Sequence, residues 1–235
     1  MRLKQYLIFS NACLIGEESS VTAQAGRRYR AADRVSVREQ LLAAAGAVMT
    51  EQDTIDVPLA EIAQRAGVNV ALVSYYFGGR DGLLLALAKR DAEQALAGLD
   101  LLMRLDLSPA AKLRKHIAGV VDSFFRHPYL NRLLRALMRD SDSAAAREIA
   151  ECFAAPTAAA VRALLEEGAR IGELRPVDPM LFHFAMHGAC ESLFSGRTML
   201  KHLHGIEAID DALRQRYAAA VTELLLAGCL APATA

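Results

Sequence analysis

The sequence has no tryptophan, only four cysteines and no long apolar run. A helix that spans a bilayer needs roughly 20 consecutive apolar residues, and no stretch approaches that length, so we expect no membrane partner. The cysteines lie far apart and match neither metal-ligand spacing nor a disulfide framework: Cys13, Cys152, Cys190 and Cys229. The pattern favours a reduced, cytoplasmic setting.

Runs of β-branched, strand-forming residues are also few, whereas alanine and leucine dominate. Apolar residues recur with the 3.6-residue period of amphipathic helices. The chain has 235 residues, of which 53% are hydrophobic and 23% charged, enough for one large or two small domains. We therefore predict an all-α fold of about nine helices.

Neither sign of charge is in excess, because 27 basic and 27 acidic residues cancel. The distribution is uneven, since the segment from Gln24 to Arg38 carries five arginines and a single acid, Asp33. Such a segment is either a solvated arm or an arm that contacts phosphates or a DNA groove. We predict that residues 1–33 form a flexible extension with this basic arm. Its short apolar start is interrupted at Asn11, so a signal peptide is the weaker interpretation.

Two short helices joined by a glycine turn are predicted within residues 34–82. Pro58 favours the start of the first, and Gly67 its left-handed end. Asn69 would cap the second, which ends at Tyr76. This succession is typical of a helix-turn-helix, whose second helix enters the DNA major groove.

Longer helices are predicted on both sides of this pair. The preceding helix would run from Ser36, as its N-cap, to Thr50. Gly78 and Gly79 break the chain, and Arg80 opens a helix that reaches about Met103 or Leu105.

The pattern of the two short helices separates a buried face from an outward face. Ile62, Val68 and Val73 are predicted to be buried, and Ala63 is small where the helices approach. The outward residues are small or polar enough to approach base edges, and two tyrosines can reach phosphates through their hydroxyls: Asn69, Val70, Ala71, Ser74, Tyr75 and Tyr76.

Residues 38–84 resemble the DNA-binding domain of the TetR (tetracycline repressor) family. The resemblance rests on Ile62-Ala63, Ala66-Gly67-Val68, Tyr76-Phe77 and Gly79-Arg80-Asp81-Gly82-Leu83, preceded by Arg38, Leu41 and Ala45. Asn69, Ala71 and Ser74 depart from the family's commoner serine, glycine and tyrosine. Arg80 stands where the family usually has a phosphate-binding lysine. Beside the outward residues, the resemblance implies DNA contacts by Arg38, Pro58, Leu59 and Arg80.

Residues 83–235 are predicted to form a second, larger helical domain. The expected helices are Pro109 to just before Pro128, Leu130 to Met138, Ala145 to Ile171 with a bend near Pro156, Pro179 to His202, and Ala208 to Leu230. The resemblance implies that this domain binds a small effector and that its last two helices form a homodimer. The candidate effector-binding residues are Met103, Phe124, Phe125, Arg135, Met138, Phe182, Met186, His187 and Glu191.

Two features invite a chemical role. His183, His187 and Glu191 share one helix face, but the stretch lacks the glutamate of the metalloprotease motif, so we predict no metal. These side chains are instead polar residues of the core or of a pocket. Cys152 and Cys190 are predicted to be buried structural cysteines rather than redox sensors.

We therefore predict a ligand-responsive transcriptional repressor without a cofactor. It would bind a palindromic DNA operator as a homodimer and be released by a small apolar or aromatic effector. A helical enzyme or carrier would need a nucleophile–base pair, a phosphate loop or a ligand cluster, and none is present in the sequence. A helical adaptor without DNA binding stays open, because zero net charge weakens the electrostatic argument.

Overall fold

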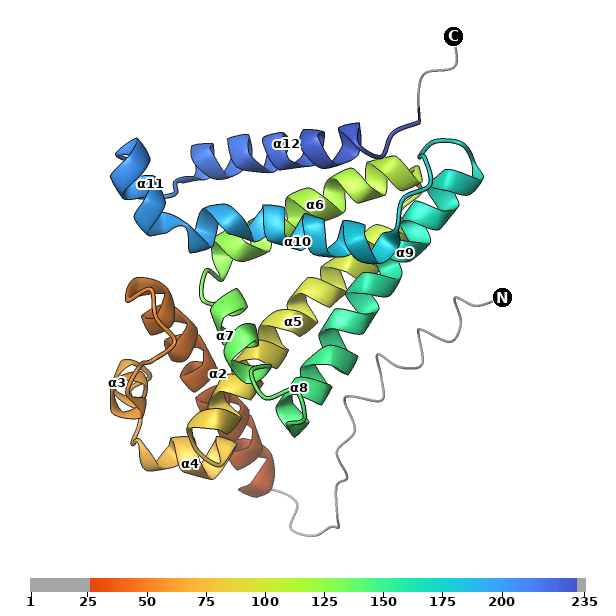
Figure 1. Cartoon of the computed structure of the whole chain (residues 1–235). Coiled ribbons are helices and arrows are strands. Elements are labelled where there is room, and N and C mark those ends of the chain that lie inside the picture. The colour runs from red at the N-terminus through yellow and green to blue at the C-terminus, as the bar shows by residue number, and fades with distance from the viewer. Residues whose placement is uncertain (1–25, 232–235) are drawn as a thin grey trace. The chain divides into compact units, whose positions relative to one another are not determined.

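The computed structural model describes residues 26–231, and for residues 26–36 it describes the backbone alone. Within this part the elements are helices, and the isolated β-bridge is an antiparallel one between Leu174 and Leu230. The all-α prediction is confirmed (Figure 1). The chain divides into two compact units: one comprises the residues up to Arg90 together with Arg132–Cys152, and the other comprises Asp91–Asn131 and the residues from Phe153 onward.

The smaller unit contains α2 (Gly26–Glu51), α3 (Leu59–Arg65), α4 (Ala71–Phe77) and the first part of α5 (Arg80–Arg104). It also includes most of α7 (Leu130–Leu137) and all of α8 (Ala144–Ile149). Its core is aliphatic and fully buried, as amphipathic periodicity requires: Leu41, Leu42, Ala45, Val48, Met49, Ile62, Val73, Leu83 and Leu87.

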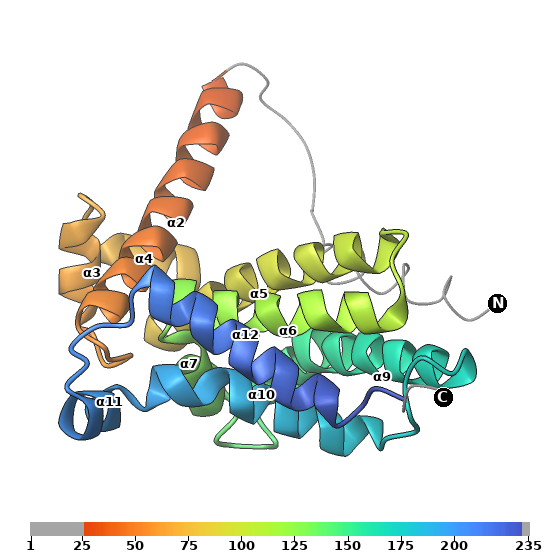
Figure 2. The same cartoon turned by 90° about the horizontal axis from the view of Figure 1, so that it is seen from above.

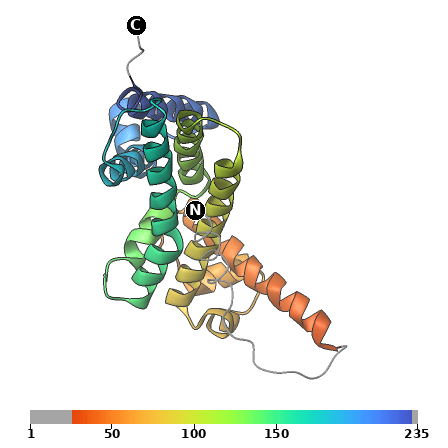
Figure 3. The same ribbon diagram turned by 90° about the vertical axis from the view of Figure 1, so that its right-hand side faces the viewer.

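Helix α2 begins at Gly26, ten residues before the predicted start. Ser36 therefore lies inside the helix and does not cap it. The backbone of the arginine-rich segment is helical too, whereas the sequence predicts a flexible arm up to residue 33. Figures 2 and 3 show the N-terminal part of α2 extending away from α3 and α4. The other residues of the predicted extension, 1–25, lie outside the described part of the chain.

The glycine turns follow the prediction closely. Gly67 has φ +68° and Gly78 has φ +73°, both in the left-handed region that glycine adopts at little cost. The N-cap of α4 is Val70, not Asn69 as predicted. The Asn69 carboxamide oxygen still accepts a hydrogen bond from the Ala71 backbone N–H at 2.8 Å, so Asn69 stabilises the start of α4 from one residue earlier. These local interactions fix the direction in which α4 leaves the turn.

The larger unit is built around α6 (Pro109–Arg126), which contacts α9 (Ala155–Arg170), α10 (Pro179–Ser195) and α12 (Asp211–Ala227). Figures 1 and 2 show α6 running beside α10 and α12. Their shared core contains aliphatic side chains, Met186, two phenylalanines and two cysteines: Leu113, Ile117, Val121, Val161, Leu164, Leu165, Phe182, Met186, Cys190, Phe194, Val221, Leu226 and Cys229. Cys190 is buried as predicted, but Cys152 is only partly buried.

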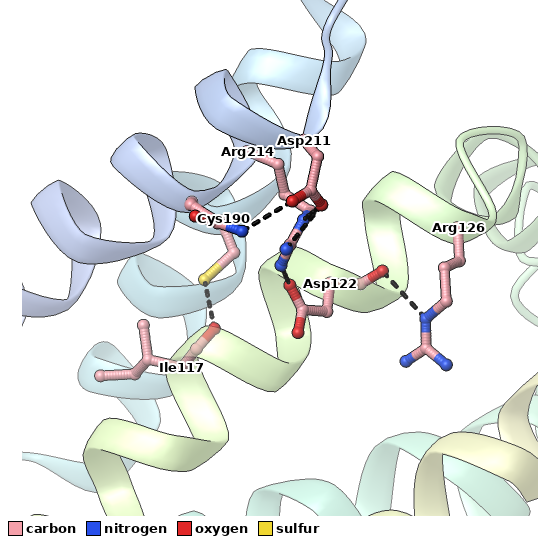
Figure 4. Close-up of polar contacts among 7 residues, drawn as sticks. Ile117, Asp122, Arg126, Cys190, Asp211 and Arg214 are labelled. Atoms are coloured by element: carbon pink, nitrogen blue, oxygen red, sulfur yellow. Dashed lines mark hydrogen bonds and ion pairs between the residues drawn. The ribbon is translucent and has the colours of Figure 1, made fainter.

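Polar contacts also connect α12 to α6 (Figure 4). The Arg214 guanidinium donates hydrogen bonds to Asp122 of α6 and, at 2.8 Å, to Asp211 one turn earlier in α12. It also lies over the Phe125 ring, 5.6 Å from the centroid. The Cys190 thiol lies 3.8 Å from the carbonyl oxygen of Ile117, which connects α10 to the same helix.

Two predicted long helices are divided in the structure. The helix expected from Ala145 to Ile171 consists of α8, a π-helix η2 (Ala150–Ala154) and α9, with Pro156 in the first turn of α9. Proline there has no N–H to donate, which accounts for the change of helical type just before it. The helix expected from Pro179 to His202 is divided at Gly196 into α10 and α11 (Arg197–His204).

Gly82 in the first turn of α5 has no room for a side chain. A Cβ atom there would lie 1.8 Å from the backbone carbonyl oxygen of Phe77, at the end of α4. We predict that Gly82→Ala lowers the free energy of unfolding by about 1–3 kcal/mol, because the two helices must separate. Urea denaturation followed by circular dichroism measures this change.

Gly98, also in α5, is the matched control because no atom lies within 4 Å of a Cβ built on it. Gly98→Ala should raise the stability by about 0.5–1 kcal/mol through its higher helix propensity. Equal effects of the two alanine substitutions would show that α4 and α5 do not pack as closely as described.

Candidate nucleic-acid interface and ligand cleft

Helix α4 presents a continuous exposed face on the smaller unit. Asn69, Val70, Ala71, Ser74 and Tyr75 are exposed, and Tyr75 retains 64% of its accessible surface. The opposite side of the helix is held in the core, since Val73 is fully buried. The outward set predicted from the sequence is therefore brought together on one side of a short, well-anchored helix.

The side of α3 that faces the turn is closely packed. Ile62 and Ala63 are 1% and 2% exposed, which agrees with the small residue expected where the two helices approach. Val68 is only partly buried, whereas the sequence pattern predicts a buried residue. Its backbone N–H donates to the Ala63 carbonyl at 3.0 Å, so the turn is closed by the main chain.

The predicted flanking contacts surround this face. Pro58 is exposed at the N-cap of α3, and Leu59 is partly buried. Tyr76 is partly buried, and its ring centroid lies 5.0 Å from that of Tyr75 in an edge-to-face arrangement. The Arg38 guanidinium lies 5.5 Å from the Phe77 ring centroid. Arg38 is thus held beside the end of α4.

Arg80 has a structural role that sequence reasoning missed. Its guanidinium donates to the backbone carbonyls of Val57 at 2.7 Å and Ile55 at 2.8 Å, and to the Asp56 carboxylate at 3.0 Å. The planar group has several donors in a fixed geometry and therefore satisfies three acceptors of one loop at once. Arg80 positions the loop that precedes α3.

A second arginine holds the other part of the same loop. Asp53 adopts a left-handed backbone conformation with φ +53°, which is uncommon for a residue with a side chain. The Arg132 guanidinium donates to both its backbone carbonyl and its carboxylate. No local pattern in the sequence pairs residues 79 positions apart, so this contact was not predictable.

The nine candidate effector-binding residues occupy different environments. Phe182 and Met186 are buried in the core of the larger unit, and Met103, Phe124 and Phe125 pack against that core. His187 and Glu191 are partly buried on α10. The remaining two, Arg135 and Met138, are exposed and belong to the smaller unit. Their role in ligand binding stays a prediction.

Three histidines lie close together between α6 and α10. His116 is 8% exposed, and the ring centroids of His183 and His187 are 4.5 Å apart. Each has one ring nitrogen without a hydrogen-bond partner among the described residues: His116 Nε2, His183 Nδ1 and His187 Nε2. We call these residues the histidine cluster.

Burial keeps the histidine cluster uncharged. Desolvation, together with the neighbouring His183, lowers the pKa of His116 to about 4, and desolvation with both neighbours lowers the pKa of His187 to about 4. Desolvation also lowers the pKa of His183. At neutral pH these imidazoles are therefore neutral, and each can either donate or accept a hydrogen bond.

A cleft of about 290 Å³ opens between α10 and the chain from η2 to α9. Its walls are mostly small or apolar, with one arginine and one histidine: Ala154, Ala155, Ala158, Arg162, Pro179, Met180, His183 and Phe184. None of the nine candidate effector-binding residues lines it. His183 connects the cleft to the histidine cluster.

Among the residues that the structure describes, no three histidine, cysteine or acidic side chains are grouped closely enough to hold a metal ion. No helix from Gly26 to Ala227 is both long and apolar enough to cross a membrane.

Two family descriptions match the chain. Residues 41–87 match "Bacterial regulatory proteins, tetR family", and residues 106–235 match "Tetracyclin repressor-like, C-terminal domain". The HTH-type transcriptional regulator BetI 1 of Chromohalobacter salexigens is 33% identical over 96 residues, or 40% of this chain and 46% of that protein. BetI of Brucella anthropi is 45% identical over 49 residues, covering 21% of this chain and 25% of its own. The chain thus spans less than half the length of these curated relatives.

Solved structures extend the likeness over most of the described fold. FadR from Bacillus subtilis, solved in complex with stearoyl-CoA, has a TM-score of 0.63 at 20% identity and covers 81% of this chain and 98% of its own. A TetR/AcrR-family regulator from Thermobifida fusca has a TM-score of 0.62 at 20% identity, covering 81% and 97%. At this identity the likeness establishes the fold.

Arg80→Ala should destabilise the loop before α3 by about 1–3 kcal/mol, because the backbone carbonyls of Val57 and Ile55 lose a charged donor. Arg80→Lys should restore only part of the stability, since one ammonium group cannot reproduce the fixed, planar arrangement of donors in the guanidinium. Chemical denaturation of the three proteins gives the comparison. If Arg80→Ala unfolds at the same urea concentration as the parent, the three hydrogen bonds do not hold the loop.

Acidification should destabilise the protein through the histidine cluster. The folded-state pKa of His116 lies below its ordinary value of 6.5, so the unfolded chain binds a proton first as the pH falls. Stability is therefore retained above about pH 6.5 and lost as the pH falls toward about 4. For one histidine the loss reaches roughly 3 kcal/mol when complete.

His116→Met removes this titration and should make the melting temperature less sensitive to pH over the same range. Leu113→Met, in the same helix and core, is the control and should keep the parent's pH dependence. Parallel pH curves for His116→Met and the parent would contradict the buried, neutral state of His116.

Proposed function

Because the chain belongs to the TetR family of bacterial regulatory proteins, we propose that it is a ligand-responsive transcriptional repressor that binds DNA as a dimer. The observation that carries the proposal is the exposed face of α4, where the outward residues gather on a helix fixed by buried Val73. A short helix presented in this way fits the major groove, and the chain before and after it meets the phosphate backbone.

Each side chain at this interface has a proposed role. Asn69, Val70, Ala71 and Ser74 approach base edges at the N-terminal end of the helix, where small residues permit close contact. Tyr75 and Tyr76 donate their hydroxyls to phosphates, and their edge-to-face packing orients both rings.

The flanking residues contact the DNA backbone. Arg38 supplies positive charge beside the end of α4, and Pro58 and Leu59 place the N-terminus of α3 against a phosphate. Arg80 acts mainly through the loop that it holds, because its guanidinium already serves three acceptors.

Reading a palindrome requires two copies of α4, and an exposed apolar surface on the larger unit supports a dimer. Leu181 and Phe184 of α10 are 62% and 71% exposed, and Leu224 of α12 is 76% exposed. The same faces carry small residues, such as Gly188 and Ala220, which let two helices approach closely. We propose that α10 and α12 of two copies pack together as a four-helix interface.

Effector binding would act on DNA affinity through α5. This helix starts directly after the glycine break that ends α4 and continues without interruption into the larger unit, so a change in its tilt would move α4. A ligand shifts this equilibrium only as far as it binds the released geometry more tightly. The relative from Bacillus subtilis, solved with stearoyl-CoA, is consistent with a repressor that responds to an organic ligand.

Fluorescence anisotropy with the chain's own upstream DNA tests the proposal. We expect tight binding to a palindromic segment, weak binding to random DNA, and steep loss of affinity as salt rises. Asn69→Ser or Ala71→Gly should change the preferred sequence and leave non-specific affinity unaltered. A folded dimer that binds no DNA even at low salt would instead favour an adaptor or a carrier.

The salt series also separates the two roles of Arg80. A direct phosphate contact predicts that Arg80→Ala reduces the salt slope by about 1, whereas a purely positioning role lowers affinity at every salt concentration with the slope unchanged.

Leu224→Arg should disrupt the dimer, because it places two charges in the proposed apolar interface without altering the buried core. Sedimentation should then give a monomer with normal helical content, and binding to the palindrome should weaken at least tenfold. Leu101→Arg is the control, since Leu101 is 64% exposed on α5 and lies outside the proposed interface. An unaltered dimer in Leu224→Arg would place the interface elsewhere.

A further inference from the structure

The cleft between α10 and the η2–α9 segment has the chemistry of a binding site for an anion with an apolar body. Six of its lining residues are alanine, proline, methionine or phenylalanine, and the other two are Arg162 and His183. None of the lining residues is acidic. We propose that the cleft binds a small carboxylic acid, whose carboxylate pairs with Arg162 and accepts a hydrogen bond from His183, as the effector of the proposed repressor. The assignment of this ligand as the effector rests on the proposed function. The binding site itself is independent of that function.

Arg162 is available for such a ligand. It is exposed on α9, and within the described chain it has neither a hydrogen bond nor an ion pair. Two other arginines of the larger unit are engaged: Arg170 pairs with Glu167 at 2.6 Å, and Arg214 with Asp211 at 2.7 Å. A guanidinium at the edge of an apolar cleft is well suited to hold a carboxylate through two parallel hydrogen bonds.

His183 provides a second polar group from the opposite wall. Its Nδ1 is fully buried, so the ring nitrogen that can reach a ligand in the cleft is Nε2, which has no hydrogen bond to any described residue. Behind it lie His187 and the almost completely buried His116, each with an unpaired ring nitrogen.

Burial favours neutral imidazoles here, because it lowers the pKa of His183 and its two neighbours. His183, the one residue of the histidine cluster that lines the cleft, therefore orients the ligand through a hydrogen bond, and Arg162 supplies the positive charge. This division of roles predicts selectivity for an acid over its neutral amide.

The dimensions of the cleft restrict the ligand. A volume of about 290 Å³ lies just below the range of roughly 300–1,000 Å³ typical of sites for drug-sized molecules. An aromatic or short aliphatic monocarboxylate suits this volume, whereas an acyl-CoA of the kind bound by the Bacillus subtilis relative is much larger. The alanines at 154, 155 and 158 create the space, and Met180 supplies apolar contact surface.

Isothermal titration of the full-length protein with benzoate, octanoate and benzamide tests the site. We expect the two carboxylates to bind at millimolar concentration or below and benzamide to bind at least about tenfold more weakly. Arg162→Gln should weaken carboxylate binding by roughly tenfold or more, and Arg162→Lys should restore part of the affinity. His183→Asn should reduce the preference for the acid over the amide.

Arg170→Gln is the matched control, because it removes one positive charge from the same helix outside the cleft. Its affinity for the carboxylates should equal that of the parent. The inference is overturned if no carboxylate binds, if acid and amide bind equally, or if Arg162→Gln binds as tightly as Arg170→Gln.

DNA binding without any probe is measured in parallel for the same proteins. Palindrome binding without carboxylate binding would contradict this inference and leave the proposed function standing. Carboxylate binding without palindrome binding would support the binding site and contradict the proposed function. Binding of both ligands with no effect of the carboxylate on DNA affinity would keep the site but remove its assignment as the effector site.

Discussion

The larger unit depends on the burial of one face of α6. Leu113, Ile117 and Val121 are fully buried on this face, and the helices that enclose it are α9, α10 and α12. Burying each side chain completely contributes about 1.5–3 kcal/mol, so this stripe is a major part of what holds the helices together. His116 lies on the same buried face and is polar, whereas the other three residues are apolar. The same burial therefore stabilises the fold and creates the uncharged histidine cluster.

The smaller unit depends on a different constraint, the fixed loop between α2 and α3. Arg80 and Arg132 approach this loop from α5 and α7 and bind its carbonyl oxygens and carboxylates. The loop leads directly into Pro58 and α3, and the glycine turn then sets the direction of α4. The exposed face of α4 is consequently positioned by polar contacts on one side and by buried Val73 on the other.

Local rules in the sequence predicted the parts of the fold that depend on neighbouring residues. Gly67 and Gly78 act within a few residues of their own positions, and their roles agree with the structure, whereas the cap predicted at Asn69 lies one residue later, at Val70. The predicted start of α2 was wrong. Serine is a common N-cap residue, yet the helix extends through Ser36. The hydrogen bonds of Arg80 and Arg132 join residues far apart in sequence, and the cleft forms only where α10 meets a π-helix, so neither could be inferred without coordinates.

The exposed apolar faces of α10 and α12 have a consequence for the concentration at which the protein acts. A palindrome is read by two copies, so wherever monomers predominate, the occupied fraction of the site grows with the square of the monomer concentration. A twofold change in synthesis would then alter occupancy about fourfold while the site is sparsely occupied. In the proposed dimer, the side chains of Leu181, Phe184 and Leu224 would thereby also set how sharply transcription responds to the amount of protein in the cell.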